Sequence, residues 1–249
     1  MDDTRWWLDS RFWSFMRPVL FNEKRMLGTD EEVEGILSLL GLSPGAHILD
    51  MCCGPGRHCL GFARRGFQVT GVDLTKEYLE EARSRAGTEG LAVDFVQDDM
   101  RRFQRPLAFD AAVNYFTSFG FFDSREDDLR VMQNLASSLK PGGRLLMEMA
   151  GREPLARDYL EKSWDEVNGV FFLRESRVED GWSRIHNRLV RIEGNQSEEA
   201  AYDVYVYSGP ELLDLAGRCG LLDARLYGTI HGHPYDQHAE RLILTATKG

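Results

Sequence analysis

The chain has 249 residues, of which 43% are hydrophobic and 28% are charged, and its formal net charge is −10. This length and composition suffice for the core of one soluble α/β domain with an insertion, and we expect a single domain over residues 1–249. The acidic balance and the absence of a basic block argue against nucleic acid as a partner. No apolar run is long enough to span a bilayer, so no membrane partner is expected.

The amino-terminal segment and the cysteines predict a cytoplasmic protein. Asp2 and Asp3 stand where a secretory signal would be basic. The sequence has four cysteines and no CxxC pair, which favours reduced thiols. A metal site is the alternative for the residues of one short stretch, but strand and helix directions should scatter them, and no metal is expected. These residues are Cys52, Cys53, His58 and Cys59.

Residues 1–30 are expected to form a helical cap. Leu8, Phe12, Phe15 and Val19 are spaced to lie on one face of a helix. Two interpretations remain open for this helix: it packs on the domain as a structural element, or it covers a ligand pocket.

Residues 47–56 are the central stretch of the sequence. His47–Met51 is strand-like, and Gly54 and Gly56 allow a tight turn that leads into a helix. Such a turn presents free N–H groups at the start of the helix, which suits an anion or a polar ligand. The strand Val69–Asp73 then ends in an acid, at the spacing expected for a carboxylate that binds a ribose diol.

Helices and strands alternate through the middle of the chain, which predicts a parallel sheet with helices on both faces. Ligands of such sheets bind at the carboxyl ends of the strands. The expected helices are one that Thr29 or Asp30 caps and that runs to Leu40, Lys76–Ala86 and Arg125–Leu139; the strands are Leu91–Gln97, Phe109–Tyr115 and Arg144–Ala150. Five polar residues lie at or near strand ends: Asp50, Asp73, Asp99, Asn114 and Glu148.

From residue 163 to residue 208 the pattern indicates an antiparallel β insertion. Its expected segments are Gly169–Val178, Ser183–Ile192 and Ala200–Tyr207, with Asp180-Gly181 as a hairpin turn. The insertion is either structural, dimer-forming, or a wall of the substrate pocket. A helix with a capping box at Ser208 follows. Two final strands are expected at Leu222–Tyr227 and Arg241–Thr247.

The order of these motifs resembles the class I S-adenosylmethionine-dependent methyltransferases over roughly residues 33–249. The family's first four motifs resemble Leu49–Gly56, Val72-Asp73, Asp99-Met100 and Phe109–Asn114, and the run Thr117–Phe122 is similar to a branch of small bacterial methyltransferases. Cys52 departs from the pattern, because many members have glycine there. The resemblance implies a Rossmann-like three-layer sandwich with a seven-stranded, mostly parallel sheet whose last strand is antiparallel.

The resemblance also implies that S-adenosylmethionine is the cofactor. Asp73 would accept two hydrogen bonds from the ribose hydroxyls, and Asp99 would bind the adenine amine. A structural alternative exists for each, since Asp73 could cap a helix and Asp99 a turn. The implied cofactor-binding residues are Asp50, Cys52, Cys53, Gly54, Gly56, Asp73, Leu74, Asp99, Met100 and Asn114.

Methyl transfer to a small molecule, at nitrogen, oxygen or a carboxylate, is the expected reaction. It requires alignment of the acceptor and exclusion of water. Tyr115 and His233 are candidate catalytic residues, although each histidine in the chain can also be structural. The expected pocket lies over the fourth and fifth strands, closed by the N-terminal helix and the loop 228–236. Its candidate residues are Phe116, Phe119, His231 and Tyr235.

Two rival functions use the same motifs. An NAD-dependent oxidoreductase would share the glycine turn and Asp73, but Cys59 replaces the third glycine of the dinucleotide fingerprint. A protein that binds S-adenosylmethionine without turnover would share all the cofactor residues. Monomer and homodimer both remain open.

Overall fold

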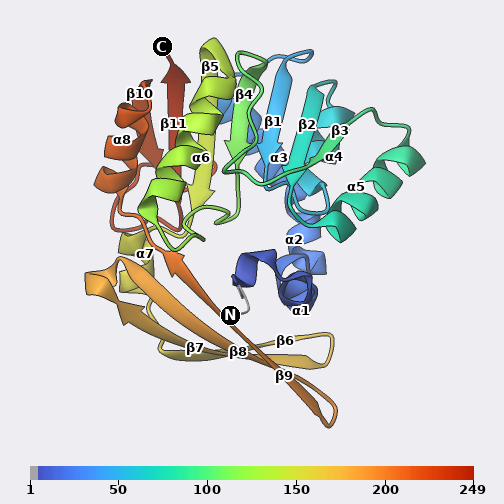
Figure 1. The fold of residues 1–249 in the computed structure, drawn as a ribbon, viewed down its shortest axis with the longest axis vertical. Coiled ribbons are helices and arrows are strands. Elements are labelled where there is room, and N and C mark those ends of the chain that lie inside the picture. Colours follow the sequence, from blue (N-terminus) through green and yellow to red (C-terminus); the bar gives the residue numbers. More distant parts are fainter. Residues whose placement is uncertain (1–4) are drawn as a thin grey trace.

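The computed structural model of the protein describes residues 5–249 and contains two β-sheets. The larger sheet has seven strands in the order β10-β11-β5-β4-β1-β2-β3. The strand β11 is antiparallel to both its neighbours, whereas β1 to β5 pair in parallel. The predicted sheet is thereby confirmed (Figure 1). Its strands are β1 (His47–Met51), β2 (Gln68–Asp73), β3 (Asp94–Gln97), β4 (Phe109–Asn114), β5 (Leu139–Met149), β10 (Leu221–Tyr227) and β11 (Leu242–Lys248).

Helices cover both faces of this sheet and form two cores. Because successive strand residues point to opposite faces, Ile48 packs in the core with Ile36, and Leu49 packs in the other with Met132. The first core contains residues of α3 (Thr29–Leu40), α4 (Arg57–Arg64) and α5 (Lys76–Glu89); the second contains residues of α6 (Arg125–Ser138) and α8 (Gly209–Arg218). No helix within residues 5–249 is long and apolar enough to cross a membrane.

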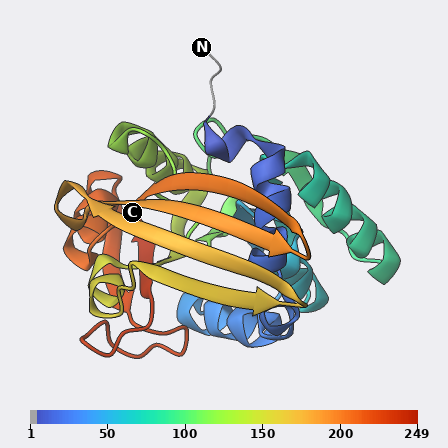
Figure 2. The same ribbon diagram turned by 90° about the horizontal axis from the view of Figure 1, so that it is seen from below.

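The second sheet has four antiparallel strands in the order β6-β7-β8-β9. Figure 1 shows it across from the carboxyl ends of the parallel strands, and Figure 2 shows it from below. The 3-10 helix η1 (Trp6–Leu8) and α1 (Ser10–Leu20) lie between the two sheets. The strands of the second sheet are β6 (Lys162–Val167), β7 (Val170–Glu179), β8 (Arg184–Glu193) and β9 (Gln196–Tyr205).

Several elements differ from the sequence expectations. The strand β6 was not predicted, because its residues are mostly exposed and show no apolar alternation. The helices α2 (Glu23–Leu27) and α7 (Arg152–Arg157) are too short for a helical period to be visible. Leu8 lies outside α1 and is 47% exposed, so it does not share the buried face of Phe12 and Phe15.

The sequence predicted N-caps for two helices, and the structure confirms one of them. At α3 neither Thr29 nor Asp30 is the N-cap, because the helix already begins at Thr29, after Gly28. The Thr29 hydroxyl instead donates to the carbonyl of Arg25. The capping box at Ser208 is confirmed, since its hydroxyl and the Glu211 carboxylate exchange bonds with the two backbone N–H groups.

The buried carboxyl of Asp128, on α6, predicts a pH effect on stability. Its side chain is fully buried and accepts a hydrogen bond from the Tyr207 hydroxyl at 2.6 Å. Burial raises the pKa of Asp128 from 3.8 to about 7. Between these values the unfolded chain has released the proton that the folded protein still holds, so the free energy of unfolding falls as pH rises. Above about pH 7 the Asp128 carboxyl is ionised in the folded protein as well, and the full free-energy cost of burying it is subtracted from the free energy of unfolding.

Asp128→Asn is therefore expected to raise the free energy of unfolding at pH 8 by about 2–4 kcal/mol and to change it little at pH 4. Urea denaturation at a series of pH values measures this. Asp127→Asn is the matched control, because Asp127 is the next residue of α6 and pairs with Arg101 and Arg130 near the surface. A gain at pH 8 in both variants, or in neither, would contradict the role of burial at Asp128.

Candidate functional site

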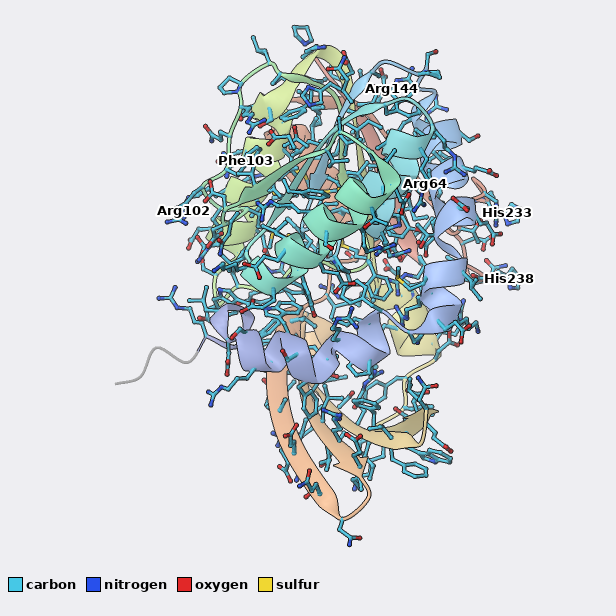
Figure 3. The ribbon with its side chains drawn as sticks, turned by 90° about the vertical axis from the view of Figure 1, so that its right-hand side faces the viewer. Arg64, Arg102, Phe103, Arg144, His233 and His238 are labelled. Carbon is cyan, nitrogen blue, oxygen red and sulfur yellow. The ribbon has the colours of Figure 1, made fainter. Side chains whose placement is uncertain are left out.

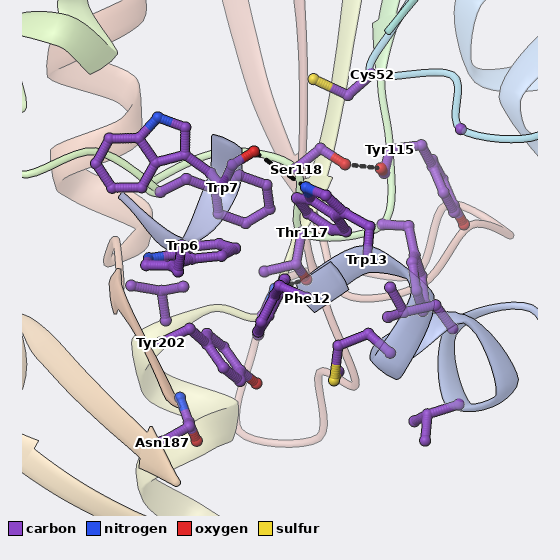
Figure 4. A pocket seen from close by; sticks show the side chains of 18 of the residues that line it. Trp6, Trp7, Phe12, Trp13, Cys52, Tyr115, Thr117, Ser118, Asn187 and Tyr202 are labelled. Carbon is purple, nitrogen blue, oxygen red and sulfur yellow. Dashed lines mark hydrogen bonds between the residues drawn. The ribbon is translucent and has the colours of Figure 1, made fainter. Parts of the chain in front are cut away.

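A cavity of about 500 Å³ lies between the carboxyl ends of the parallel strands, the N-terminal segment and the second sheet. The turn after β1 and the ends of β2 and β4 form one wall. The inner face of β7, β8 and β9 forms another. Figure 4 shows the aromatic side chains of Trp6, Trp7, Phe12 and Trp13 in the space between Cys52 and Tyr202. The site thus joins segments from both ends of the chain.

The turn after β1 has three left-handed residues. Cys52, Gly54 and Gly56 have φ angles of 64°, 54° and 75°. Cys52 adopts the conformation that glycine takes most easily, so the departure from the family pattern leaves the turn intact at a local conformational cost. Its Sγ lies 3.4 Å from the Met100 Sδ.

Gly56 faces away from the cavity, and its replacement is a test of the turn. A Cβ there would lie 2.9 Å from the Ala82 Cβ, and the φ of 75° disfavours any side chain. We expect Gly56→Ala to destabilise the fold by about 2–4 kcal/mol, from strain and overpacking together. Gly87→Ala, in open space on α5, should be neutral or stabilising by up to about 1 kcal/mol. Equal effects in denaturant titrations of the two variants would contradict this account.

The carboxylate of Asp73, at the end of β2, is fixed by the backbone and lines the cavity. It accepts hydrogen bonds from the N–H groups of Gly54 and Thr75, both at 2.8 Å. Burial raises the pKa of Asp73, although these two hydrogen bonds act to lower it. Each carboxylate oxygen keeps further acceptor capacity, so the group can receive a pair of ligand hydroxyls.

Two other acids line the cavity with different partners. Asp50 is 2% exposed, and its carboxylate accepts from the Cys59 Sγ at 3.1 Å. Asp99 is paired with Arg101 at 2.6 Å. Burial opposes ionisation of Asp99, but the hydrogen bonds from Arg101 outweigh it and lower the pKa of the carboxyl. A ligand amine would therefore share Asp99 with Arg101.

Asn114, at the end of β4, does not line the cavity. Its side chain is fully buried, and Nδ2 donates to the carbonyl of Met51 at 3.1 Å. Oδ1 is buried without a hydrogen-bond partner among the described residues. The remaining predicted cofactor residues that line the cavity are Cys52, Cys53, Gly54, Leu74 and Met100.

Arginines at the cavity were not predicted from the sequence. Arg25 of α2 lies over the ring of Phe116, 4.2 Å from its centroid, and no carboxylate among the described residues is within ion-pair distance of it. Burial and the nearby charges of Arg241 and Arg57 lower the pKa of Arg25. Arg57 by contrast pairs with Glu32. A lone arginine in a short helix carries no sequence signal, so only the fold shows that Arg25 lines the cavity.

The loop after β4 is strained, and hydrogen bonds to Glu148 and Arg241 hold it in place. Phe116 and Thr117 have φ angles of 68° and 55°. The buried Glu148 accepts from the N–H of Phe116 at 2.7 Å and pairs with Arg241, which also donates to the Thr117 hydroxyl. Tyr115 and Phe116 line the cavity, and burial raises the pKa of Tyr115 above its usual value. Its hydroxyl consequently stays protonated and can donate or accept a hydrogen bond.

The structure does not bring the other predicted pocket residues to the cavity. Phe119 is 1% exposed and packs on Tyr207, with ring centroids 5.3 Å apart. The loop 228–236 folds away onto other elements: His231 faces Glu31 at 3.2 Å, and the Tyr235 hydroxyl donates to Glu153 at 2.7 Å. His233 is exposed at the outer surface (Figure 3). None of the residues 228–236 lines the cavity.

The cavity suits the cofactor that the sequence resemblance implies. A fixed carboxylate is present for a ribose diol, and an unpaired guanidinium is present for a carboxylate. Apolar side chains of Val72, Leu74 and Met100 lie beside Asp73 and Asp99, where a flat base could pack. The fit rests on Asp73 and Arg25 facing one cavity from separate elements.

Comparisons with known protein sequences agree with this arrangement. A family model described as a methyltransferase domain matches residues 48–143. A Bacillus subtilis protein named as a methyltransferase, YqeM, is 25% identical over 207 residues, which cover 81% of this chain and 83% of that protein. The ubiquinone biosynthesis O-methyltransferase of Xanthomonas campestris is 34% identical over 115 residues. That alignment spans 45% of this chain and 46% of the relative, about half of each.

Solved structures share the fold at low identity. An S-adenosylmethionine-dependent methyltransferase from Clostridium acetobutylicum superposes with a TM-score of 0.78 at 16% identity, covering 96% of this chain and 98% of that one. CalS10, an amino pentose methyltransferase from Micromonospora echinaspora solved with S-adenosylmethionine, has a TM-score of 0.70 at 21% identity, covering 91% and 94%. At these identities the likeness concerns the fold alone.

Proposed function

Because the chain belongs to the class I S-adenosylmethionine-dependent methyltransferases, we propose that it transfers the methyl group to a small-molecule acceptor held in the cavity described above. The observation that carries the proposal is the continuity of this cavity. It runs from Asp73 and the glycine turn to the aromatic side chains of the N-terminal segment and the second sheet. Cofactor and acceptor can therefore occupy one continuous space.

Bound S-adenosylmethionine supplies a methyl group on a sulfonium, which a nucleophile can take without metal or covalent catalysis. In the proposed complex Asp73 accepts from the ribose hydroxyls, and Arg25 binds the methionyl carboxylate. Asp99 lies where the adenine amine would share it with Arg101. The turn Cys52–Gly54 brings backbone close to the cofactor.

The chain's own contribution to the reaction is alignment and exclusion of water. Trp6, Phe12 and Trp13 give the acceptor an apolar wall. Tyr115 is proposed to orient the acceptor by a hydrogen bond, since its raised pKa disfavours a role as the proton-abstracting base. An acceptor that is nucleophilic at working pH fits this site best.

The printed names of relatives support a small acceptor. The relatives above include proteins named for ubiquinone biosynthesis and for an amino pentose. A DNA base is a poorer fit, because the cavity is closed by aromatic side chains from the N-terminal segment and the chain carries a formal net charge of −10.

Two measurements test the proposal. Calorimetric titration with S-adenosylmethionine and with NAD should show binding of the first and not of the second. Release of S-adenosylhomocysteine with a panel of small amines, phenols and carboxylic acids should then identify turnover. Tighter binding of NAD would favour the oxidoreductase, and cofactor binding without turnover on any acceptor would favour a binding protein.

Arg25 allows a sharper test of the cofactor's orientation. Arg25→Met is expected to weaken S-adenosylmethionine binding by about 10- to 100-fold, because one hydrogen-bonded charge is lost. Binding of 5′-methylthioadenosine, which lacks the amino-acid part, should not change. Arg17→Met is the control, since Arg17 of α1 pairs with the surface residue Glu81. An equal loss for both ligands would mean that Arg25 acts on the fold and not on the carboxylate.

A further inference from the structure

The inner face of the second sheet carries a group of cavity-lining hydrogen-bond donors. Asn187 on β8 stands between Ser176 on β7 and Tyr202 on β9, directly opposite each in the register. Arg174 lies two residues before Ser176, so its side chain projects from the same face. All four residues line the cavity. Figure 4 shows two of them, Asn187 and Tyr202, across the cavity from Cys52 of the glycine turn.

Arg174 lacks a counter-charge on this wall. Its Nε is buried without a hydrogen-bond partner, and no carboxylate within residues 5–249 is within ion-pair distance of it. The three arginines of β8 each have a counter-charge: Arg184 pairs with Asp203, Arg188 with Glu199 and Arg191 with Glu193. A partly buried guanidinium without an acceptor is costly, so its position against the cavity indicates a ligand that supplies one.

Asn187 adds a second donor directed at the same space. Its Oδ1 accepts from the Ser176 hydroxyl at 2.8 Å, which leaves the amide NH₂ without a partner among the described residues. Figure 4 shows that nitrogen on the side of the cavity aromatics and the oxygen turned away. Arg174 also faces Tyr202 closely enough for its charge to oppose the rise that burial causes in the pKa of that hydroxyl.

The acids that line the cavity do not neutralise this wall. Asp50, Asp73, Asp98 and Asp99 lie at the opposite wall, at the ends of the parallel strands and in the segment after β3. Asp158, nearer the second sheet, pairs with Arg157 at 2.5 Å. The wall of Arg174 and Asn187 thus offers donors and positive charge only, in a protein whose formal net charge is −10. Such a local charge selects for a negative group on the ligand rather than for a basic one.

We propose that the methyl acceptor is an apolar molecule with a carboxylate, and that Arg174 and Asn187 bind this carboxylate at the end of the cavity remote from the glycine turn. The proposal rests on the proposed function and specifies the class of its substrate. A guanidinium binds a carboxylate through two parallel hydrogen bonds, which fixes direction as well as position. The apolar body then lies among Trp6, Phe12 and Tyr202, and a different group of the acceptor faces the methyl.

Paired probes test the proposal in the full-length protein saturated with S-adenosylhomocysteine. Calorimetric titrations with 2-naphthoate and 2-naphthamide compare a charged and a neutral ligand of one shape. We expect naphthoate to bind about 10- to 100-fold more tightly, the effect of one charge-assisted pair. Arg174→Met should abolish the preference, and Arg174→Lys should retain part of it. Arg188→Met, at a paired arginine on the outer face, should leave it unchanged.

The outcomes separate this inference from the proposed function. Equal affinities for acid and amide in the unmodified protein, or no binding of either, would overturn the carboxylate site without needing a variant. Loss of the preference in Arg188→Met as well would show a general electrostatic effect and overturn the role of Arg174. Failure of the unmodified protein to bind S-adenosylhomocysteine would instead contradict the proposed function. Normal binding of S-adenosylhomocysteine by Arg174→Met shows that a lost preference reflects the acceptor end of the cavity.

Discussion

Asp73→Ala is expected to weaken S-adenosylmethionine binding by about 10- to 150-fold, which corresponds to 1.5–3 kcal/mol for hydrogen bonds to a charged group. The carboxylate faces the cavity from the end of β2, where a ribose diol would meet both oxygens. The substitution also leaves the N–H groups of Gly54 and Thr75 without their acceptor. We therefore expect a loss of about 1–2 kcal/mol in folding stability as well, because buried donors lose their partners.

Asp94→Ala is the matched control for this prediction. Asp94 lies at the opposite end of the neighbouring strand, since Thr70 pairs with Asp94 and Asp73 with Gln97. Its carboxylate is exposed and pairs with Arg105. Calorimetry should show unchanged affinity for the cofactor in this variant. An unchanged affinity in Asp73→Ala as well would remove the main support for the proposed cofactor site.

The glycine turn and its acid could be predicted because their signals are local. A strand that ends in Asp50, a turn with Gly54 and Gly56, and a second strand that ends in Asp73 stand within about 25 residues, and each has a distinct physical requirement. The order of strands followed from the same alternation. Local pattern therefore sufficed for the sheet and for one half of the cavity.

The arginines of the cavity could not be predicted in this way. Arg25 and Arg174 are about 150 residues apart in the sequence, and only the packing of α2 and β7 brings them to one space. Arginine is a residue type that usually lies at the protein surface, so neither position stands out in the sequence. Their lack of a carboxylate partner is visible only when the neighbouring side chains are known.

The loop 228–236 shows why a position next to a strand end is insufficient to predict that a residue lines the cavity. The start of β11 does lie at the expected edge, because Leu242 pairs with Met149 at the end of β5, and Arg241 lines the cavity. The loop itself leaves that edge, since Ile230 packs against Gly35 of α3. Register places the ends of strands, whereas the path of a long loop depends on which apolar surface it covers.

Deletion of residues 1–20 is expected to unfold the protein or to lower its melting temperature severely. If the segment served only to cover a ligand pocket, such a deletion would affect turnover more than folding. In the structure Trp7, Phe12, Phe15 and Met16 are only 5–7% exposed, and they pack on both the main core and the second sheet. Losing large buried side chains costs about 2–5 kcal/mol each, so the sum approaches the total stability of a typical domain. Thermal unfolding of the truncated chain measures this.

A single substitution separates the structural role of this segment from its role at the cavity. Trp6 is partly buried, and its ring meets those of Phe121 and Tyr202 at 5.0 Å and 5.4 Å, so it bridges the two walls. Trp6→Ala should open the cavity to water and lower turnover at least tenfold, on the scale of lost alignment, while the protein remains folded. Leu8→Ala, 47% exposed in the same turn, should alter neither property. A truncated chain that folds normally would contradict the structural role of the N-terminal segment, whereas a Trp6→Ala variant with unchanged turnover would contradict its role at the cavity.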